Sequence, residues 1–197
     1  MRIKNVIVLT GLAATTASIS PCVLAQSRGP FVGASIGQAD FRDACAQAST
    51  SGTTCDKSDT AFSGFFGFQM DKVAAIEAGY TDLGKATSTG TGGTTSTVAK
   101  GFELTGVGSV PLSTRFSLFV KAGVFRWDLD QKTSAPGSNL SQTKTGTDLT
   151  YGFGMRLNFT NTFALRAQYQ RYKDIGDDAI SSKTDIDVIS VGAIFSF

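Results

Sequence analysis

The chain has 197 residues with 18 basic and 16 acidic side chains, 22 glycines, 15 phenylalanines and no histidine. This length corresponds to one domain, and the weak net charge argues against a nucleic-acid partner. The absence of histidine excludes Ser-His-Asp and Cys-His catalysis and most zinc sites, so we predict neither an enzyme nor a cofactor or metal centre.

Residues 1–25 have the order of a secretory signal peptide. Arg2 and Lys4 precede an apolar run at 6–14, and the small-x-small pattern at 23–25 is typical of a cleavage site. The alternative is a transmembrane anchor, but the apolar run is well short of the roughly 18 residues that a spanning helix needs. We therefore expect a leader at 1–25 and a single mature domain at 26–197 that is close to electrically neutral.

Eight segments of the mature chain alternate apolar residues with small or polar ones, which predicts β-strands with two unlike faces. They are 31–41, 60–70, 73–83, 101–110, 115–127, 149–159, 163–172 and a last strand that ends at Phe197. After the leader, the sequence holds no apolar stretch long enough for a spanning helix. A bilayer protein built from this chain must therefore be a β-barrel, whose strands need only about 9–11 residues each.

The last strand shows the alternation most clearly. Its apolar face consists of Ile189, Val191, Ala193, Phe195 and Phe197. A soluble protein seldom leaves such an edge exposed, whereas a closed barrel in lipid has no edge and an apolar outer face. The faces that we assign to the interior of the first and last strands carry small side chains: Gly33, Ser35, Gly37, Ser190, Gly192 and Ser196. We therefore expect the closing seam to be the small-residue side of the lumen.

The connections alternate in length. Long polar segments fall at 42–59, 85–100, 128–147 and 173–184, and short turns fall at 71–72, 111–114 and 160–161. This is the layout of an outer-membrane barrel, and a soluble barrel of the lipocalin kind need not show it. The Gly/Ser/Thr run within 85–100 lacks the ending of a phosphate-binding loop, so we expect a flexible exposed loop. The predicted fold is an all-β, eight-stranded antiparallel up-and-down transmembrane β-barrel.

Cys45 and Cys55 are the only cysteines of the mature chain, because Cys22 falls in the leader. An exported protein with one cysteine pair is expected to oxidise it. Closing so short a loop would stabilise the fold by roughly 2–3 kcal/mol on chain-entropy grounds. A metal site is the alternative, but two thiols without a histidine make a poor one.

Five charged residues lie on the small-residue faces of predicted strands. They are Glu77, Glu103, Lys121, Arg156 and Arg166. A basic side chain facing lipid at mid-depth costs about 2–4 kcal/mol and an acid somewhat less, so we place these residues inside the barrel. There they would have to pair, because isolated buried charges are costly. Such a cluster would fill the barrel and fasten its strands.

Two further chemical alternatives remain open. Glu77 and Glu103 could serve as an acid–base pair, but a filled barrel would deny them substrate. Asp174, Asp177 and Asp178 could bind a divalent ion near lipopolysaccharide, although a solvated loop is the simpler reading.

Several motifs, taken together and in order, resemble the OmpA transmembrane domain and its relatives over essentially all of 26–197. They are Phe31-Val-Gly-Ala-Ser-Ile-Gly37, Gly79-Tyr-Thr-Asp-Leu-Gly84, Leu165-Arg-Ala-Gln-Tyr-Gln170, Asp174-Ile-Gly-Asp177 and the Phe-ending last strand. The resemblance implies a barrel in a Gram-negative outer membrane, with both termini in the periplasm and four long loops outside. It also implies that the outer-membrane assembly machinery reads the last strand, with Phe195 and Phe197.

The resemblance implies interior ion pairs that either only fill the barrel or gate a water path, and it carries over to these charges residue by residue. Glu77 falls on a family interior glutamate, Arg166 on an interior arginine and Lys121 on a basic interior position. Arg156 falls where the family's type member has an acid, so the ion-pair pattern is rearranged rather than copied. Full-length members also carry a peptidoglycan-binding domain, but no cell-wall tether can be inferred for this chain.

We therefore expect an integral outer-membrane protein with a structural role in the envelope and at most a narrow porin-like path. The alternative is an adhesion or recognition module that displays its long loops to a host or cell-surface ligand. In either case the expected partners are outer-membrane lipid, lipopolysaccharide and the assembly machinery.

Overall fold

The structure is a computed structural model that describes residues 28–42, 54–90, 93–135, 138–176 and 183–197. The predicted leader at 1–25 and Cys45 lie outside these ranges. The described residues form nine strands: β1 (Gly29–Phe41), β2 (Thr54–Asp56), β3 (Ser58–Gln69), β4 (Ala74–Gly90), β5 (Gly93–Pro111), β6 (Phe116–Ala135), β7 (Ser138–Asn158), β8 (Phe163–Ile175) and β9 (Thr184–Ser196). The described part of the chain holds no helix capable of crossing a membrane.

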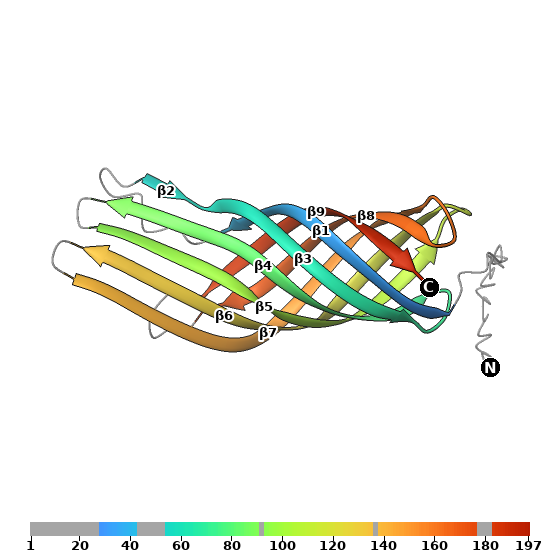
Figure 1. Cartoon of the computed structure of the whole chain (residues 1–197), viewed down its shortest axis with the longest axis horizontal. Coiled ribbons are helices and arrows are strands. Elements are labelled where there is room, and N and C mark those ends of the chain that lie inside the picture. Colours follow the sequence, from blue (N-terminus) through green and yellow to red (C-terminus); the bar gives the residue numbers. More distant parts are fainter. Residues whose placement is uncertain (1–27, 43–53, 91–92, 136–137, 177–182) are drawn as a thin grey trace, which may run out of the picture.

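Eight of these strands close into one antiparallel barrel (Figure 1). Each strand from β3 to β9 pairs with its neighbour in sequence, and β1 pairs with both β3 and β9 to close the sheet. The short β2 is an addition that pairs only with the far end of β4. The predicted eight-stranded up-and-down barrel is therefore confirmed.

The alternation of side chains runs as predicted. Ile189 of β9 and Phe197 directly after that strand face outward and are 68% and 75% exposed, whereas Ile194 on the opposite face of β9 is 2% exposed. The same alternation places an apolar band around the outer wall. This band ends on every barrel strand at a polar, outward-facing residue toward the long-connection end: Gln38, Thr60, Asp82, Lys100, Arg126, Thr147, Arg171 and Asp187. This ring marks the outer boundary of the membrane-spanning part.

The three predicted short turns are present at the opposite end, and a side-chain oxygen caps each one. Asp71 Oδ1 accepts hydrogen bonds from the backbone N–H groups of Val73 and Ala74, both at 2.8 Å. The hydroxyls of Ser113 and Thr160 accept in the same way from residues three positions further on, at 3.1 and 2.9 Å. Short polar side chains of this kind stabilise tight turns by replacing backbone acceptors.

Two predicted loops are mostly strand. The β4–β5 ladder continues to the Gly90–Gly93 pair, and the β6–β7 ladder continues to Ala135–Ser138. The expectations of a flexible exposed loop at 85–100 and of a long loop at 128–147 are therefore wrong. The predicted loop at 42–59 likewise contains β2 and the start of β3. Figure 1 shows these strands running well past the rest of the barrel. Their serines and threonines occupy both faces, so no apolar alternation marks them as strands.

The seam between β1 and β9 is the small-residue side of the lumen, as predicted. Ser35 lies opposite Gly192, and its hydroxyl is 2.6 Å from that of Ser63 on β3. The ring of Phe65 lies over Gly33, where an added Cβ would come within 2.3 Å of that ring. The glycines therefore make room for aromatic side chains that reach across the interior.

Candidate functional site

The five charged residues predicted for the lumen come from five successive strands, β4 to β8, and the structure places all of them inside the barrel. Glu77, Glu103, Lys121 and Arg166 are between 2% and 7% exposed. Each occupies an inward-facing position of its strand, so the strand period and the register bring them to one level. Charges this deeply buried must be compensated locally.

Four of the five form a continuous chain of ion pairs. Arg166 Nη1 lies 2.7 Å from Glu77 Oε1, and Lys121 Nζ lies 2.9 Å from Glu103 Oε1. Lys121 Nζ is also 3.9 Å from Glu77 Oε2, so the lysine connects the two carboxylates. Two acids and two bases therefore neutralise one another across β4, β5, β6 and β8.

Two uncharged residues of β8 complete this network, and the sequence prediction left them out of the site. Gln170 Nε2 donates to Glu103 Oε2 at 2.6 Å and to Thr150 Oγ1 at 2.8 Å. The Tyr172 hydroxyl donates to Glu103 Oε2 at 3.1 Å. The sequence held one signal for them: Gln170 and Tyr172 lie four and six positions after Arg166, so they share the inward face of β8 with it.

Arg156 does not join the ion pairs. It lies directly opposite Arg166 in the β7–β8 register, and its guanidinium carbon is 5.7 Å from the centre of the Phe31 ring. Among the described residues no carboxylate lies within ion-pair distance of it, and its Nε has no hydrogen-bond partner. The expectation that all five charges pair is therefore wrong for Arg156. The lumen layer retains one excess positive charge.

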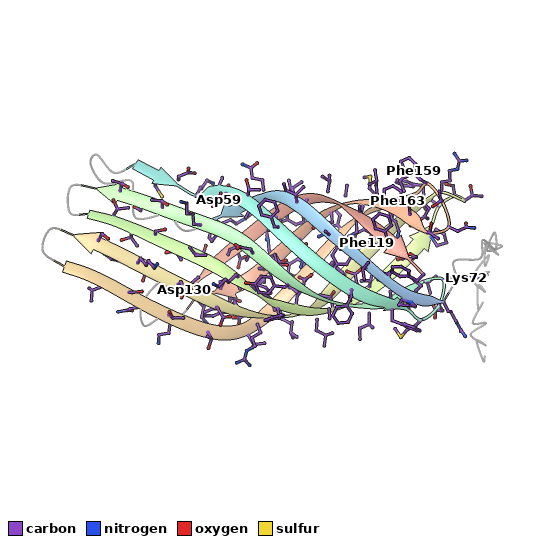
Figure 2. All side chains as sticks on the ribbon, viewed as in Figure 1. Asp59, Lys72, Phe119, Asp130, Phe159 and Phe163 are labelled. Carbon is purple, nitrogen blue, oxygen red and sulfur yellow. The ribbon has the colours of Figure 1, made fainter. Side chains whose placement is uncertain are left out.

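Apolar side chains fill the barrel on both sides of the charged layer. Toward the long hairpins a cluster includes Phe41, Leu83, Phe125, Trp127, Leu129, Tyr172 and Ile186. Toward the short turns a second cluster consists of Phe31, Phe65, Ala75, Val107, Phe119, Ala164 and Ile194. Figure 2 shows Phe119 within the barrel and Phe159 and Phe163 near the β7–β8 turn.

Aromatic rings pack against the charged layer on both of its sides. The Arg166 guanidinium carbon lies 4.1 Å from the centre of the Phe65 ring and 5.4 Å from that of Phe119. On the other side, the rings of Phe125 and Tyr172 are 4.6 Å apart. A guanidinium stacked on rings retains favourable electrostatic contact without water. The layer is therefore packed between two apolar plugs.

A small polar cavity of about 10 Å³ lies beside the seam, lined in part by Ser35, Gln168 and Ser190. Gln168 Oε1 and Ser190 Oγ are buried without a hydrogen-bond partner in the protein. A volume of this order is that of a single water site. The cavity can hold a water molecule but is too small to serve as a route for a solute.

A second polar cluster lies on the outer wall at the membrane boundary. The Asp187 carboxylate accepts from Arg171 Nε at 2.6 Å and from the Tyr169 hydroxyl at 2.7 Å, and it also pairs with Arg42. Burial opposes ionisation of Asp187, but the hydrogen bonds from Arg171, Tyr169 and Arg42 outweigh it and lower its pKa to about 2. The same contact with Asp187 raises the pKa of Arg42 and of Arg171.

The remaining predicted site residues are only partly described. Cys55 is disulfide-bonded, but Cys45 lies outside the described residues, so their pairing stays a prediction. Phe195 and Phe197, the predicted assembly signal, face outward at the end of the barrel where the short turns lie. The ring centres of Phe195 and Phe163 are 5.1 Å apart.

Comparison with known proteins gives the same picture. The family model for the OmpA-like transmembrane domain matches residues 26–197. Outer membrane protein A of Yersinia pseudotuberculosis is 26% identical over 170 residues, which cover 85% of this chain and 48% of that protein. Outer membrane protein A of Salmonella typhi is 27% identical over 135 residues, which cover 68% of this chain and 39% of that protein. The chain thus spans about half or less of the length of these relatives.

Solved structures show the same fold at lower sequence identity. Neisserial surface protein A aligns with a TM-score of 0.57 and 14% identity, covering 86% of this chain and 97% of that one. Ail, the attachment invasion locus protein of Yersinia pestis, aligns with a TM-score of 0.53 and 17% identity, covering 87% and 100%. The match to the family model over residues 26–197, together with the closed barrel and its apolar outer band, shows that the chain belongs to the OmpA-like transmembrane domain family and is an integral β-barrel protein of the Gram-negative outer membrane.

Proposed function

We propose that this protein acts as a structural component of the outer membrane, with at most a narrow path through its lumen, and that it is not an enzyme. The observation that carries the proposal is the packed charged layer between two apolar clusters. Glu77, Glu103, Lys121 and Arg166 neutralise one another's charges there, so the layer links four strands from inside.

Movement of an ion through this barrel would be costly. It would have to separate pairs held at 2.7 and 2.9 Å, and each charge left unpaired in a buried site carries a penalty of several kcal/mol. It would also have to displace the packed rings of Phe125 and Tyr172. Conduction would therefore require rearrangement of the interior rather than simple diffusion.

Single-channel recording of the purified barrel in planar bilayers tests this proposal. We expect the wild type to give no steady current, and we expect Glu77→Gln to give more frequent openings because Arg166 and Lys121 lose a partner. Asp130→Asn, which changes an exposed carboxylate outside the lumen, serves as the control. A steady, salt-dependent wild-type current that changes in Arg156→Gln would contradict the proposal and favour a path.

A second candidate function is recognition at the cell surface, and the projecting hairpins favour it. Strand β6 continues for nine residues beyond Arg126 at the membrane boundary, which is about 30 Å of extended chain. Its neighbours β5 and β7 project with it, as does β4 beside β5, so a paired sheet rather than a set of loose loops stands outside the membrane. A preorganised surface loses less conformational entropy on binding.

Hairpin shortening distinguishes the two functions. Removal of residues 86–97 should abolish binding to host cells or phage if recognition is the task. The variant should retain heat-modifiable gel migration, because the membrane-spanning ladder is intact. Equal binding by the shortened and full-length proteins would remove the recognition candidate and leave the structural role.

We also propose that residues 1–25 are cleaved on export, that Cys45 pairs with Cys55, and that the assembly machinery reads the last strand. Mass spectrometry of protein recovered from outer membranes should give a chain starting at Gln26, two mass units below its fully reduced mass. Replacing Phe197 by alanine should reduce assembly in cells but leave refolding of the purified chain intact. Equal loss in both settings would indicate a packing defect instead of a lost signal.

A further inference from the structure

The outer wall carries an apolar groove of about 680 Å³ across β1, β9, β8 and β7. Ala34 lies opposite Ala193, and Ala167 lies opposite Val191 and Met155, so these residues form one continuous surface. Three alanines occupy positions where the surrounding wall has larger side chains, including Phe62 and Leu157. The short side chains hollow the wall, and the volume is in the range of roughly 300–1,000 Å³ found for small-ligand pockets.

The position of the groove identifies the chemistry of its occupant. All of its outward-facing side chains belong to the apolar band below Gln38, Arg171 and Asp187, so it opens into the hydrocarbon core of the membrane. Only an apolar chain can fill such a surface there, because water and polar groups are excluded from that region. An acyl chain of a membrane lipid satisfies this condition.

The polar cluster at the boundary lies on three of these four strands: Tyr169 and Arg171 on β8, Asp187 on β9, and Arg42 directly after the end of β1. Arg171 is four residues beyond Ala167 along β8, about 13 Å at roughly 3.3 Å per residue. Arg171 and Arg42 share the single carboxylate of Asp187, which leaves one excess positive charge. The adjacent Asp40 and Lys57 pair with each other at 3.2 Å and add no net charge.

Arg42 is the group best placed to contact a headgroup. Its side chain is 53% exposed, whereas the Asp187 side chain that holds it is 13% exposed. A guanidinium fixed on one side by a carboxylate still presents free N–H donors on the other, and its planar geometry suits phosphate oxygens. The cluster therefore complements an anionic headgroup at the level where outer-leaflet headgroups lie.

We propose that the groove and the two arginines Arg42 and Arg171 form one binding site for the lipid A portion of lipopolysaccharide. An acyl chain lies in the groove over Ala34, Ala167 and Ala193, and a phosphate lies against Arg42 and Arg171. Lipopolysaccharide occupies the outer leaflet, where these arginines are, and it combines phosphate groups with several acyl chains.

Native mass spectrometry of the refolded protein with purified bisphosphorylated lipid A tests the site. Arg42→Gln and Ala167→Phe should each lower lipid A affinity about tenfold or more, because one removes a charged donor and the other fills the groove. Arg126→Gln and Ala122→Phe, which change an outward arginine and an outward alanine on β6 away from the groove, are the matched controls. Arg42→Gln alters no packed side chain, so it keeps the test valid if Ala167→Phe folds poorly.

Three further measurements decide among occupants. Dephosphorylated lipid A should bind the wild type as weakly as lipid A binds Arg42→Gln. If phosphatidylglycerol binds as tightly as lipid A and depends on the same residues, the site takes phospholipid and the proposal fails. Dimers of the wild type that disappear in Ala167→Phe would show that a second copy covers the groove, which would also overturn it. Equal losses in the test and control variants would mean that no specific site exists.

Discussion

Arg166 and Glu77 are 89 positions apart in the chain, yet Nη1 of one and Oε1 of the other lie 2.7 Å apart inside the barrel. Glu77 lies on β4 and Arg166 on β8, and these two strands do not pair with each other. The contact therefore crosses the lumen. Lys121 lies 3.9 Å from the second oxygen of Glu77. Glu77 therefore ties together β4, β6 and β8.

Glu77→Gln should destabilise the barrel by roughly 3–5 kcal/mol, because Arg166 and Lys121 would be left with too little negative charge in a buried site. Urea unfolding in lipid vesicles measures this change. Asp130→Asn removes an exposed pair with Lys100 of 3.7 Å and should cost less than about 1 kcal/mol. A Glu77→Gln effect no larger than that of this control would show that the cluster contributes little.

Arg156 and Arg166 face one another across the β7–β8 pair but should respond in opposite ways to the same substitution. Arg166→Met leaves Glu77 without its closest partner and should cost roughly 3 kcal/mol or more. Arg156→Met removes a cation with no paired carboxylate among the described residues, so the free energy of unfolding should stay within about 1 kcal/mol or rise. Equal destabilisation by the two variants would contradict the assignment of Arg156 as the excess charge.

Gly33 tests the packing of the seam. An added Cβ would lie 2.3 Å from the Phe65 ring and 2.7 Å from the carbonyl oxygen of Ala193, so Gly33→Ala should cost about 1–3 kcal/mol by overpacking. Gly64 is the matched control, because a Cβ there meets nothing within 4 Å. Unfolding measurements that give both variants the same stability would show that Phe65 does not fill the space over Gly33.

The Asp187 cluster predicts a pH dependence of stability. The folded pKa of Asp187 is about 2, below its ordinary value of 3.8, so its ionised form stabilises the folded barrel. This contribution is present in full above about pH 4 and is lost as the pH falls toward 2. Asp187→Asn should be less stable at pH 6 and should show a shallower decline in that window.

Arg171→Gln provides the partner test for this titration. It removes two hydrogen bonds to Asp187, at 2.6 and 3.0 Å, so the decline in stability should begin at a higher pH than in the wild type. Unfolding free energies collected between pH 6 and pH 2 give all three profiles. Identical profiles for the three proteins would mean that Asp187 does not contribute through its charge.

The charged layer shows how far sequence reasoning reaches into a site. The alternation of side chains along each strand indicated that Glu77, Lys121 and Arg166 face inward, because every second side chain of a strand lies on the same face. This alternation could not indicate that Arg156 lacks a carboxylate partner among the described residues. Nor could it indicate that Gln170 and Tyr172 donate hydrogen bonds to Glu103. Those relationships depend on the stagger between strands, which sets which inward residues share a level.

The sequence by itself determined the number of barrel strands, their inner and outer faces and the position of the short turns. It could do so because each membrane-spanning strand faces apolar lipid on one side and the lumen on the other. Its residues therefore alternate between apolar side chains and polar or small ones. Outside the membrane that contrast vanishes, so β4 to β7 could not be followed to their ends through residues such as Thr89 and Thr143. Only the tertiary structure decided their length, because backbone pairing with neighbouring strands extends them. It also decided the cross-lumen pair of Arg166 with Glu77 and the groove over Ala167, because both arise from barrel closure, which brings distant strands to one level.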